Sequence, residues 1–172
     1  AIDCADPSTI VELEENIAFV AGGTPDGVHG SINLVDITES TNPSVISEIE
    51  LPGGRVMNFA VSDRGLIAVR TLNRIGIDLY NIQDPVHPSF VSNIPPMPVV
   101  GGVYGSELDF TFGDGSLFIS DAHEQWPGGV FPPRIMRVNI LDPQDPYLME
   151  ILEFDIISMG CLRPDNLLFN EN

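Results

Sequence analysis

The sequence predicts an all-β protein made of repeated four-stranded antiparallel units, and two observations support this prediction. The first is a phrase, LVDITESTNPSVISEI (34–49), that returns in register as LYNIQDPVHPSFVSNI (79–94) and more loosely as RVNILDPQDPYLMEIL (137–152). The second is a short hairpin pattern that precedes every copy of the phrase. Self-similarity with a period of about 40 to 50 residues is typical of propellers, solenoids and arrays.

The hairpin pattern consists of two arms around a turn whose residues tolerate positive φ or favour a bend. Its copies are TIVELEENIAFVA (9–21), NFAVSDRGLIAVR (58–70) and LDFTFGDGSLFIS (108–120). The expected turns are Glu15-Asn16, Asp63-Arg64-Gly65 and Asp114-Gly115. The second arm of each copy is continuously apolar, which predicts a strand that is buried on both faces of its sheet.

The repeated phrase divides into a strand, a turn rich in Pro, Asp, Ser and Asn, and a second strand. Pro43, Pro88 and Pro146 fall just outside the expected strands, where the missing N–H of proline is tolerated. Hairpin and phrase together give four strands per unit, and no amphipathic helical stretch separates the units. This pattern predicts the blades of a β-propeller, at about 9–50, 56–95 and 107–153, with 156–172 as the first hairpin of a fourth.

The predicted ring is incomplete, because propellers typically close with about four to eight blades. Three explanations remain open. The chain is a fragment of a longer propeller, another polypeptide supplies the missing blades, or identical subunits complete one another head to tail. Open blade edges recruit further strands, and head-to-tail completion that does not close gives a filament. The sequence therefore predicts a protein partner, or identical subunits, at the exposed edges.

The pattern L-V-D-I-x-x-x-x-x-P-x-V, and the N-I-x-D-P-x-x-P shared by the second and third copies, resemble the LVIVD repeat of bacterial and archaeal surface proteins. The resemblance runs from about Ile10 to Ile151, although the defining tetrapeptide reads LVDI, LYNI and RVNI here. It implies a β-propeller at the cell surface or outside the cell that serves as a scaffold for interaction. It implies no activity common to the family, and no catalytic residues are carried over.

Composition excludes several partners and favours one location. The 25 acidic residues oppose seven arginines without any lysine, and the formal net charge of -18 argues against binding nucleic acid or anionic membranes. No apolar run approaches the roughly 20 residues of a membrane-spanning helix. Cys4 and Cys161 are either a disulfide or two free thiols. This composition favours a secreted or cell-surface protein in an oxidising setting.

Three connections of variable length are expected to lie on one face of the blades, at 21–30, 95–105 and 120–133. Loops on a rigid scaffold often carry binding residues. The side chains expected on this binding face are His29, Tyr104, His123, Trp126 and Phe131. Aromatic side chains supply contact area, so the face is interpreted as a recognition surface. For Trp126 and Phe131 individually, the alternative is that they pin a long loop to its blade.

The sequence offers little for catalysis. It contains no nucleophile elbow, zincin motif, Walker motif, dinucleotide fingerprint or C-x-x-C pair, so a non-enzymatic protein is predicted. The cluster Asp121, His123 and Glu124 lacks a second His at ligand spacing, and the Asp-Pro turns lack a calcium-loop pattern. No cofactor is therefore assigned, whether calcium or a transition metal. The alternative function is a fragment of a metal-dependent, oxidoreductase-like propeller enzyme with His29 and His123 as metal ligands.

Overall fold

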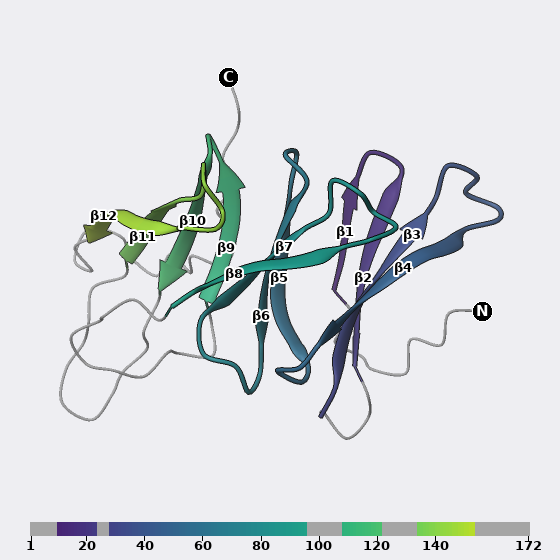
Figure 1. The fold of residues 1–172 in the computed structure, drawn as a ribbon, viewed down its shortest axis with the longest axis horizontal. Coiled ribbons are helices and arrows are strands. Elements are labelled where there is room, and N and C mark those ends of the chain that lie inside the picture. The colour runs from purple at the N-terminus through teal and green to yellow at the C-terminus, as the bar shows by residue number, and fades with distance from the viewer. Residues whose placement is uncertain (1–9, 24–27, 96–107, 122–133, 154–172) are drawn as a thin grey trace, which may run out of the picture. The chain divides into compact units, whose positions relative to one another are not determined.

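The computed structural model describes residues 10–23, 28–95, 108–121 and 134–153, and all regular secondary structure in them is β (Figure 1). Its strands are β1 (Val11–Glu14), β2 (Ile17–Gly23), β3 (Gly30–Asp36), β4 (Ser44–Leu51), β5 (Val56–Ser62), β6 (Leu66–Thr71), β7 (Ile77–Asn81), β8 (Ser89–Ile94), β9 (Leu108–Gly113), β10 (Ser116–Asp121), β11 (Arg134–Asn139) and β12 (Tyr147–Glu153). Among the described residues there is no helix, and hence none with the length and hydropathy to cross a membrane.

The strands form three four-stranded antiparallel sheets, each built from consecutive strands. Sheet 1 contains β1 to β4, sheet 2 contains β5 to β8, and sheet 3 contains β9 to β12. The predicted all-β class and the four strands per unit are confirmed. The chain divides into two compact units, residues 1–95 with sheets 1 and 2 and residues 96–172 with sheet 3. The hairpin expected at 156–172 lies outside the described residues.

All three hairpin turns fall where their residues predicted them. Glu15 has a φ of 50° between β1 and β2, and Gly65 has a φ of 73° between β5 and β6. Asp114 and Gly115, with φ values of 45° and 68°, both have positive φ between β9 and β10. Two successive positive φ values favour Asp-Gly, because short polar residues and glycine enter this region at the lowest cost.

The turns of the repeated phrase also share their chemistry. A side-chain oxygen at the end of each third strand accepts a hydrogen bond from the backbone N–H two residues later: Asp36 from Thr38 at 2.8 Å, Asn81 from Gln83 at 2.9 Å and Asn139 from Leu141 at 2.9 Å. Proline then stands directly before β4, β8 and β12, as predicted. The bend therefore has the same local cause in every sheet.

Each sheet carries an irregularity of register at the same place, between its third and fourth strands. The shift lies between Leu34 and Val35 in sheet 1, between Leu79 and Tyr80 in sheet 2, and between Arg137 and Val138 in sheet 3. These pairs occupy matching positions of the repeated phrase. A bulge changes which face the following side chains point to. Positions can therefore be matched between sheets by register as well as by sequence.

Sheets 1 and 2 pack face to face, and β5 lies beside β1 and β2 (Figure 1). We call the side of sheet 1 that meets sheet 2 its front face, and its other side the back face. The side of sheet 2 that meets sheet 1 is the back face of sheet 2. One hydrophobic core joins them. The front face of sheet 1 contributes Phe19, Ala21, Ile32, Leu34 and Ile49, and the back face of sheet 2 contributes Phe59, Ile67, Val69 and Tyr80. Each of these side chains is at most 6% exposed.

Two hydrogen bonds accompany this packing. The hydroxyl of Ser47 in β4 donates to the carbonyl of Pro85, in the turn between β7 and β8, at 2.5 Å. The backbone N–H of Val61 in β5 donates to the Glu12 carboxylate in β1 at 3.1 Å. One bond lies at the β4 edge of sheet 1 and the other at its β1 edge. Together they fix the alignment of one sheet on the other.

The interior strands show the predicted double burial most clearly in sheet 2. Leu66, Ile67, Ala68 and Val69 of β6 are all at most 8% exposed. In sheet 1, by contrast, Ile17 and Val20 of β2 are only half-buried. Val20 points to the back face of sheet 1, on which the neighbouring β1 side chains are exposed. The prediction thus holds where both faces of a sheet are covered.

The crossover between β4 and β5 requires a glycine where it passes β3. A Cβ on Gly30 would lie 2.1 Å from the carbonyl oxygen of Gly54. That oxygen belongs to the backbone, so it cannot turn aside as a flexible side chain would. Gly22, in the neighbouring strand, has room, because a Cβ there would lie 3.8 Å from the nearest atom, the Ser31 hydroxyl oxygen.

We predict that Gly30→Ala lowers the free energy of unfolding by about 1–3 kcal/mol, because the crossover must shift to admit the methyl group. Gly22→Ala is the matched control and should be neutral or slightly stabilising, since it adds β-propensity without a clash. Chemical denaturation followed by circular dichroism measures both variants. Equal stability of the two would contradict the close approach of Gly54 to β3.

Candidate functional site

The rim on which the sequence placed a binding face is described only in part. We define the rim as the loops at the β2–β3, β4–β5 and β6–β7 ends of sheets 1 and 2. Of the predicted binding residues, His29 lies here, exposed, directly before β3. The others, Tyr104, His123, Trp126 and Phe131, lie outside the described residues, as do Cys4 and Cys161. The structure therefore leaves their grouping as a prediction.

Within the rim, two loops are tied together by backbone hydrogen bonds. The N–H of Leu72 donates to the carbonyl of Arg55, and the N–H of Asn73 donates to that of Gly53, both at 2.9 Å. The Thr71 hydroxyl lies directly against Gly53, where a Cβ would meet it at 1.9 Å. The β4–β5 and β6–β7 loops are thus held as one surface, which gives this rim a defined shape.

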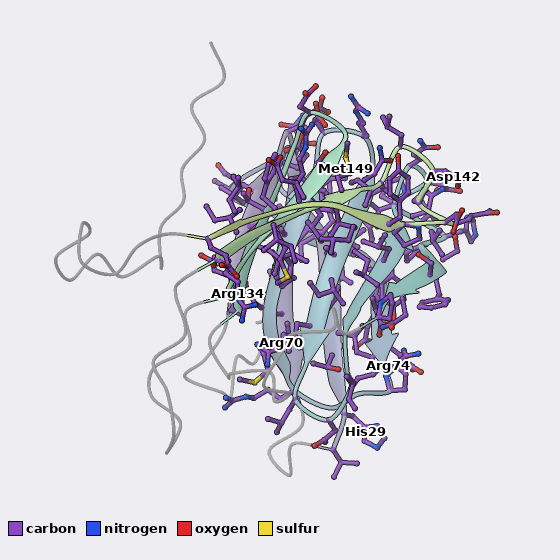
Figure 2. The ribbon with its side chains drawn as sticks, turned by 90° about the vertical axis from the view of Figure 1, so that its left-hand side faces the viewer. His29, Arg70, Arg74, Arg134, Asp142 and Met149 are labelled. Atoms are coloured by element: carbon purple, nitrogen blue, oxygen red, sulfur yellow. The ribbon has the colours of Figure 1, made fainter. Side chains whose placement is uncertain are left out.

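Arginine is the feature of the rim that sequence reasoning missed. Arg55, Arg70 and Arg74 all lie in or beside these loops, in a chain with seven basic residues and no lysine. Figure 2 shows Arg70, Arg74 and His29 toward the same end of the ribbon. The signal was present in the sequence, since each arginine falls at the end of a predicted strand or in a connection.

Arg74 takes part in a cluster on the back face of sheet 2. Its guanidinium binds the Asp78 carboxylate at 2.7 Å and lies 5.6 Å from the centre of the Phe90 ring. Asp78 is only 3% exposed and also accepts a hydrogen bond from the Asn93 amide at 2.8 Å. The Tyr80 and Phe90 rings meet edge to face, with centres 5.6 Å apart. A buried carboxylate with two donors is a stable arrangement and leaves it little capacity for chemistry.

Burial raises the pKa of the Tyr80 phenol above its usual value, and the negative charge of Asp78 raises it further, while Arg74 opposes the shift. The neutral phenol is therefore the form that the folded protein favours. This tyrosine serves as an aromatic packing residue at neutral pH.

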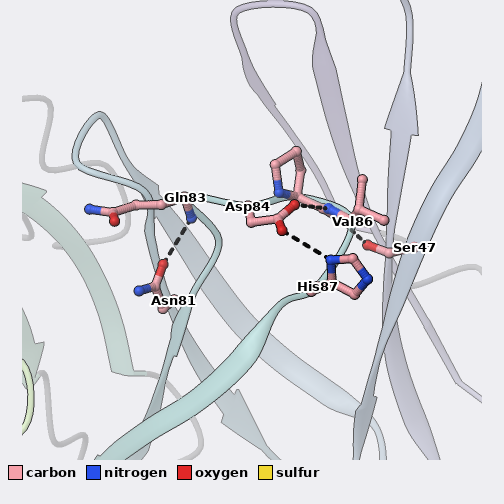
Figure 3. A network of polar contacts seen from close by, with 7 residues as sticks. Ser47, Asn81, Gln83, Asp84, Val86 and His87 are labelled. Atoms are coloured by element: carbon pink, nitrogen blue, oxygen red, sulfur yellow. Dashed lines mark hydrogen bonds and ion pairs between the residues drawn. The ribbon is translucent and has the colours of Figure 1, made fainter.

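The opposite rim carries the uniform turns of the repeated phrase (Figure 3). Asp84 accepts hydrogen bonds from the His87 ring at 3.0 Å and from the Val86 N–H at 3.0 Å. Both hydrogen bonds lower the pKa of Asp84, and the one from His87 has the larger effect. Hydrogen bonds from Thr38 likewise lower the pKa of Asp36. All of these groups are local turn elements, and Ser47 connects this rim to sheet 1 through Pro85.

The least expected surface is the back face of sheet 1. Val11 and Leu13 of β1 are 53% and 66% exposed, and register places them on the side turned away from sheet 2, beside Val20 and Ala18. Val20 and Ala18 match Val69 and Ile67 of sheet 2, which are paired with Phe59 and Val61. Phe59 and Val61 are therefore the counterparts of Val11 and Leu13 in sheet 2. Phe59 is 1% exposed, and Val61 packs against the shared core.

One set of positions is therefore covered in sheet 2 and open in sheet 1. Sheet 2 has its back face packed against sheet 1, whereas Val11 and Leu13, at the equivalent positions of sheet 1, are exposed. Contiguous apolar surface on a folded protein commonly marks an interaction site. We take the back face of sheet 1 as the candidate functional site.

No protein-family model and no curated protein sequence matches the chain. Function must therefore be argued from the surfaces of the molecule. Among the described residues, no group of three His, Cys, Asp or Glu side chains is arranged to hold a metal ion. His29 is exposed at the edge of the rim, and its proposed partner His123 lies outside the described residues.

We predict that Asp78→Ala lowers the free energy of unfolding by about 2–3 kcal/mol, because Arg74 and Asn93 lose their buried acceptor. Asp145→Ala removes the same group from an exposed turn and should change stability by less than about 0.5 kcal/mol. Denaturant titration of both variants measures the difference. A neutral Asp78→Ala would show that the buried cluster does not stabilise the fold.

Tyr80 provides a test of the same cluster that depends on pH. Asp78→Asn should lower the pKa of Tyr80 toward its usual value, because the negative charge that disfavours phenolate is gone. In the native protein, the contribution of Tyr80 to stability is complete below the unfolded-state pKa near 10 and is lost as pH rises through the higher folded-state pKa. NMR titration of tyrosine labelled at Cζ follows both effects. An unchanged Tyr80 titration in the variant would refute the assigned electrostatic coupling.

Proposed function

We propose that the chain is a non-enzymatic, extracellular binding and assembly module of the β-propeller type, which accepts a further β-sheet on the back face of sheet 1. A single observation carries the proposal. Val11 and Leu13 are exposed on this face, while their counterparts Phe59 and Val61 pack against a neighbouring sheet.

The propeller assignment is supported by features that recur from sheet to sheet. Each sheet has four antiparallel strands in chain order, a register irregularity before its fourth strand and a proline before that strand. Sheets 1 and 2 stack face to face, as successive blades do. The resemblance to the LVIVD repeat points to the same architecture and to a surface or extracellular location. The lysine-free, strongly acidic composition agrees with such a location.

The chemistry of the open face favours a sheet as its ligand. At Val11, Leu13 and Val20 its side chains are aliphatic and follow the alternation of two paired strands, while Asn33 and Glu48 lie beyond them on the same face. Another sheet can cover it at the usual spacing of about 10 Å between packed sheets. Covering Val11 and Leu13 would contribute about 1–2 kcal/mol for each side chain.

The sequence placed the contact at open strand edges, whereas the exposure of the described residues favours a sheet face. The two ideas differ in the bonds that they use. An edge binds through backbone hydrogen bonds, and a face binds through buried side chains. The front face of sheet 1 shows the second mode inside this chain, in its packing on sheet 2.

A tandem duplication tests the proposal directly. Ile10 matches Asn58 by register, so a second copy of residues 10–57 placed ahead of Ile10 positions an extra sheet against Val11 and Leu13. We predict that the longer chain unfolds at higher denaturant concentration, with a gain of about 2–4 kcal/mol, because adjacent repeats stabilise one another through their interface. Guanidinium denaturation monitored by tryptophan fluorescence and circular dichroism measures the gain.

The matched control carries the same duplication with Leu13→Glu in the copy that keeps its native place. Burial of an unpaired carboxylate at this position should remove the gain. If both duplicated chains unfold together with the original one, the back face of sheet 1 does not accept a sheet and the proposed function is wrong.

A further inference from the structure

We infer that the sheet accepted on the back face of sheet 1 is sheet 3 of a second copy of this chain. This inference rests on the proposed function, and it names the partner. The chain carries two surfaces that bear on this contact: the back face of sheet 1 and the front face of sheet 3, which matches the front face of sheet 1 by register.

The front face of sheet 3 carries apolar side chains that are open to solvent, beside the polar residues Arg137 and Glu150. Leu152 and Tyr147 are 45% and 55% exposed, and Phe118 and Ile135 are half-buried. On the opposite side of sheet 3 the two interior strands are buried, since Leu117, Ile119, Met136 and Val138 are each at most 3% exposed. Sheet 3 thus leaves open the kind of face that sheet 1 presents to sheet 2.

The apolar residues of the two front faces agree in kind. By register, Phe118 matches Phe19 and Ile135 matches Ile32. Leu152, paired with Ile135, matches Ile49, which is paired with Ile32. In sheet 1 these positions are at most 4% exposed, because sheet 2 covers them. Sheet 3 therefore carries the side chains that pack on a back face, at the positions where they are needed.

A polar exchange completes the match. In the contact between sheets 1 and 2, Ser47 donates to the carbonyl of Pro85. Glu150 of sheet 3 matches Ser47, and Ser40 of sheet 1 matches Pro85. Glutamate only accepts hydrogen bonds, whereas Ser40, unlike proline, offers an N–H and a hydroxyl. Relative to the contact between sheets 1 and 2, the donor and the acceptor are exchanged. A hydrogen bond can therefore form between Glu150 of one copy and Ser40 of the other.

The two surfaces also exchange a large and a small side chain. Arg137 stands in sheet 3 where sheet 1 has Leu34, and Ala18 stands on the back face of sheet 1 where sheet 2 has Ile67. Arg137 lies over the Phe118 ring at 5.7 Å and donates to the Ser116 hydroxyl at 3.0 Å, so its stem stays on the sheet. The larger side chain on one surface meets the smaller one on the other, which preserves packing volume.

Joining a front face to a back face is a head-to-tail contact. Such contacts close into a ring or continue as a filament. The net charge of -18 on every copy opposes association at long range. Salt screens that repulsion and leaves apolar packing intact, so association should strengthen between low and moderate ionic strength.

Sedimentation velocity of the full chain over a range of concentrations tests the inference. We expect the wild-type chain to form species larger than a monomer, more so at higher salt. Leu13→Glu blocks the back face of sheet 1, Leu152→Glu blocks the front face of sheet 3, and each variant alone should be monomeric. An equimolar mixture of the two should form a dimer and nothing larger, because one intact contact remains between unlike copies.

The control is Ile75→Glu, which places the same charge at an equally exposed apolar residue, 66% as for Leu13, in the β6–β7 loop. It should associate as the wild type does, and circular dichroism should show all variants folded. A monomeric wild type, or a Leu13→Glu and Leu152→Glu mixture that stays monomeric, would overturn the inference. If the tandem duplication still stabilises the chain in that case, the back face accepts a sheet and only its identity as a second copy is wrong.

The hydrogen bond between Glu150 and Ser40 can be tested separately. Glu150→Ala and Ser40→Ala should each weaken association by about tenfold, as expected for a hydrogen bond to a charged group. Both changes together should weaken it no further than either alone, because the two residues share one bond. Additive losses would show that Glu150 and Ser40 do not meet across the contact.

Discussion

The packing of sheet 1 on sheet 2 is the interaction on which the rest of the structure depends. A single four-stranded sheet in this chain has apolar residues on both faces, as the complete burial of Leu66 to Val69 in β6 illustrates. Such a sheet is not stable with both faces in water, so each one needs a neighbour. Phe19 and Leu34 on one side and Phe59 and Ile67 on the other satisfy that need once. The same requirement is left unsatisfied at Val11 and Leu13, which remain exposed on the back face of sheet 1.

Polar groups decide how the sheets align without supplying most of the energy. Ser47 and Glu12 reach across to backbone groups of sheet 2 from opposite edges of sheet 1. The Asp78 cluster lies on the back face of sheet 2 and is satisfied by Arg74 and Asn93. Because buried polar groups cost energy when they are unpaired, these contacts penalise any other register. Apolar area drives the stacking, and hydrogen bonds select one arrangement.

The strong negative charge and the open apolar faces act against each other. Negative charge opposes the association of copies, whereas covering the exposed side chains of Leu13 and Leu152 would lower the free energy. The proposed assembly should therefore respond to concentration and to salt. Three of the seven arginines, Arg55, Arg70 and Arg74, lie at one rim, whereas Arg137 lies on the front face of sheet 3.

The sequence by itself determined the all-β class, the four strands of each unit, the hairpin turns and the proline before each fourth strand. These features are local: Asp114-Gly115 favours its turn, and Pro146 ends its connection, whatever surrounds them. The candidate site was not predictable in this way. Leu13 and Val61 look alike as strand residues, and only the stacking of the sheets leaves one exposed and packs the other against a core. The Asp78 cluster joins residues from separate strands for the same reason. Burial depends on what covers a face, and that is a property of the tertiary structure alone.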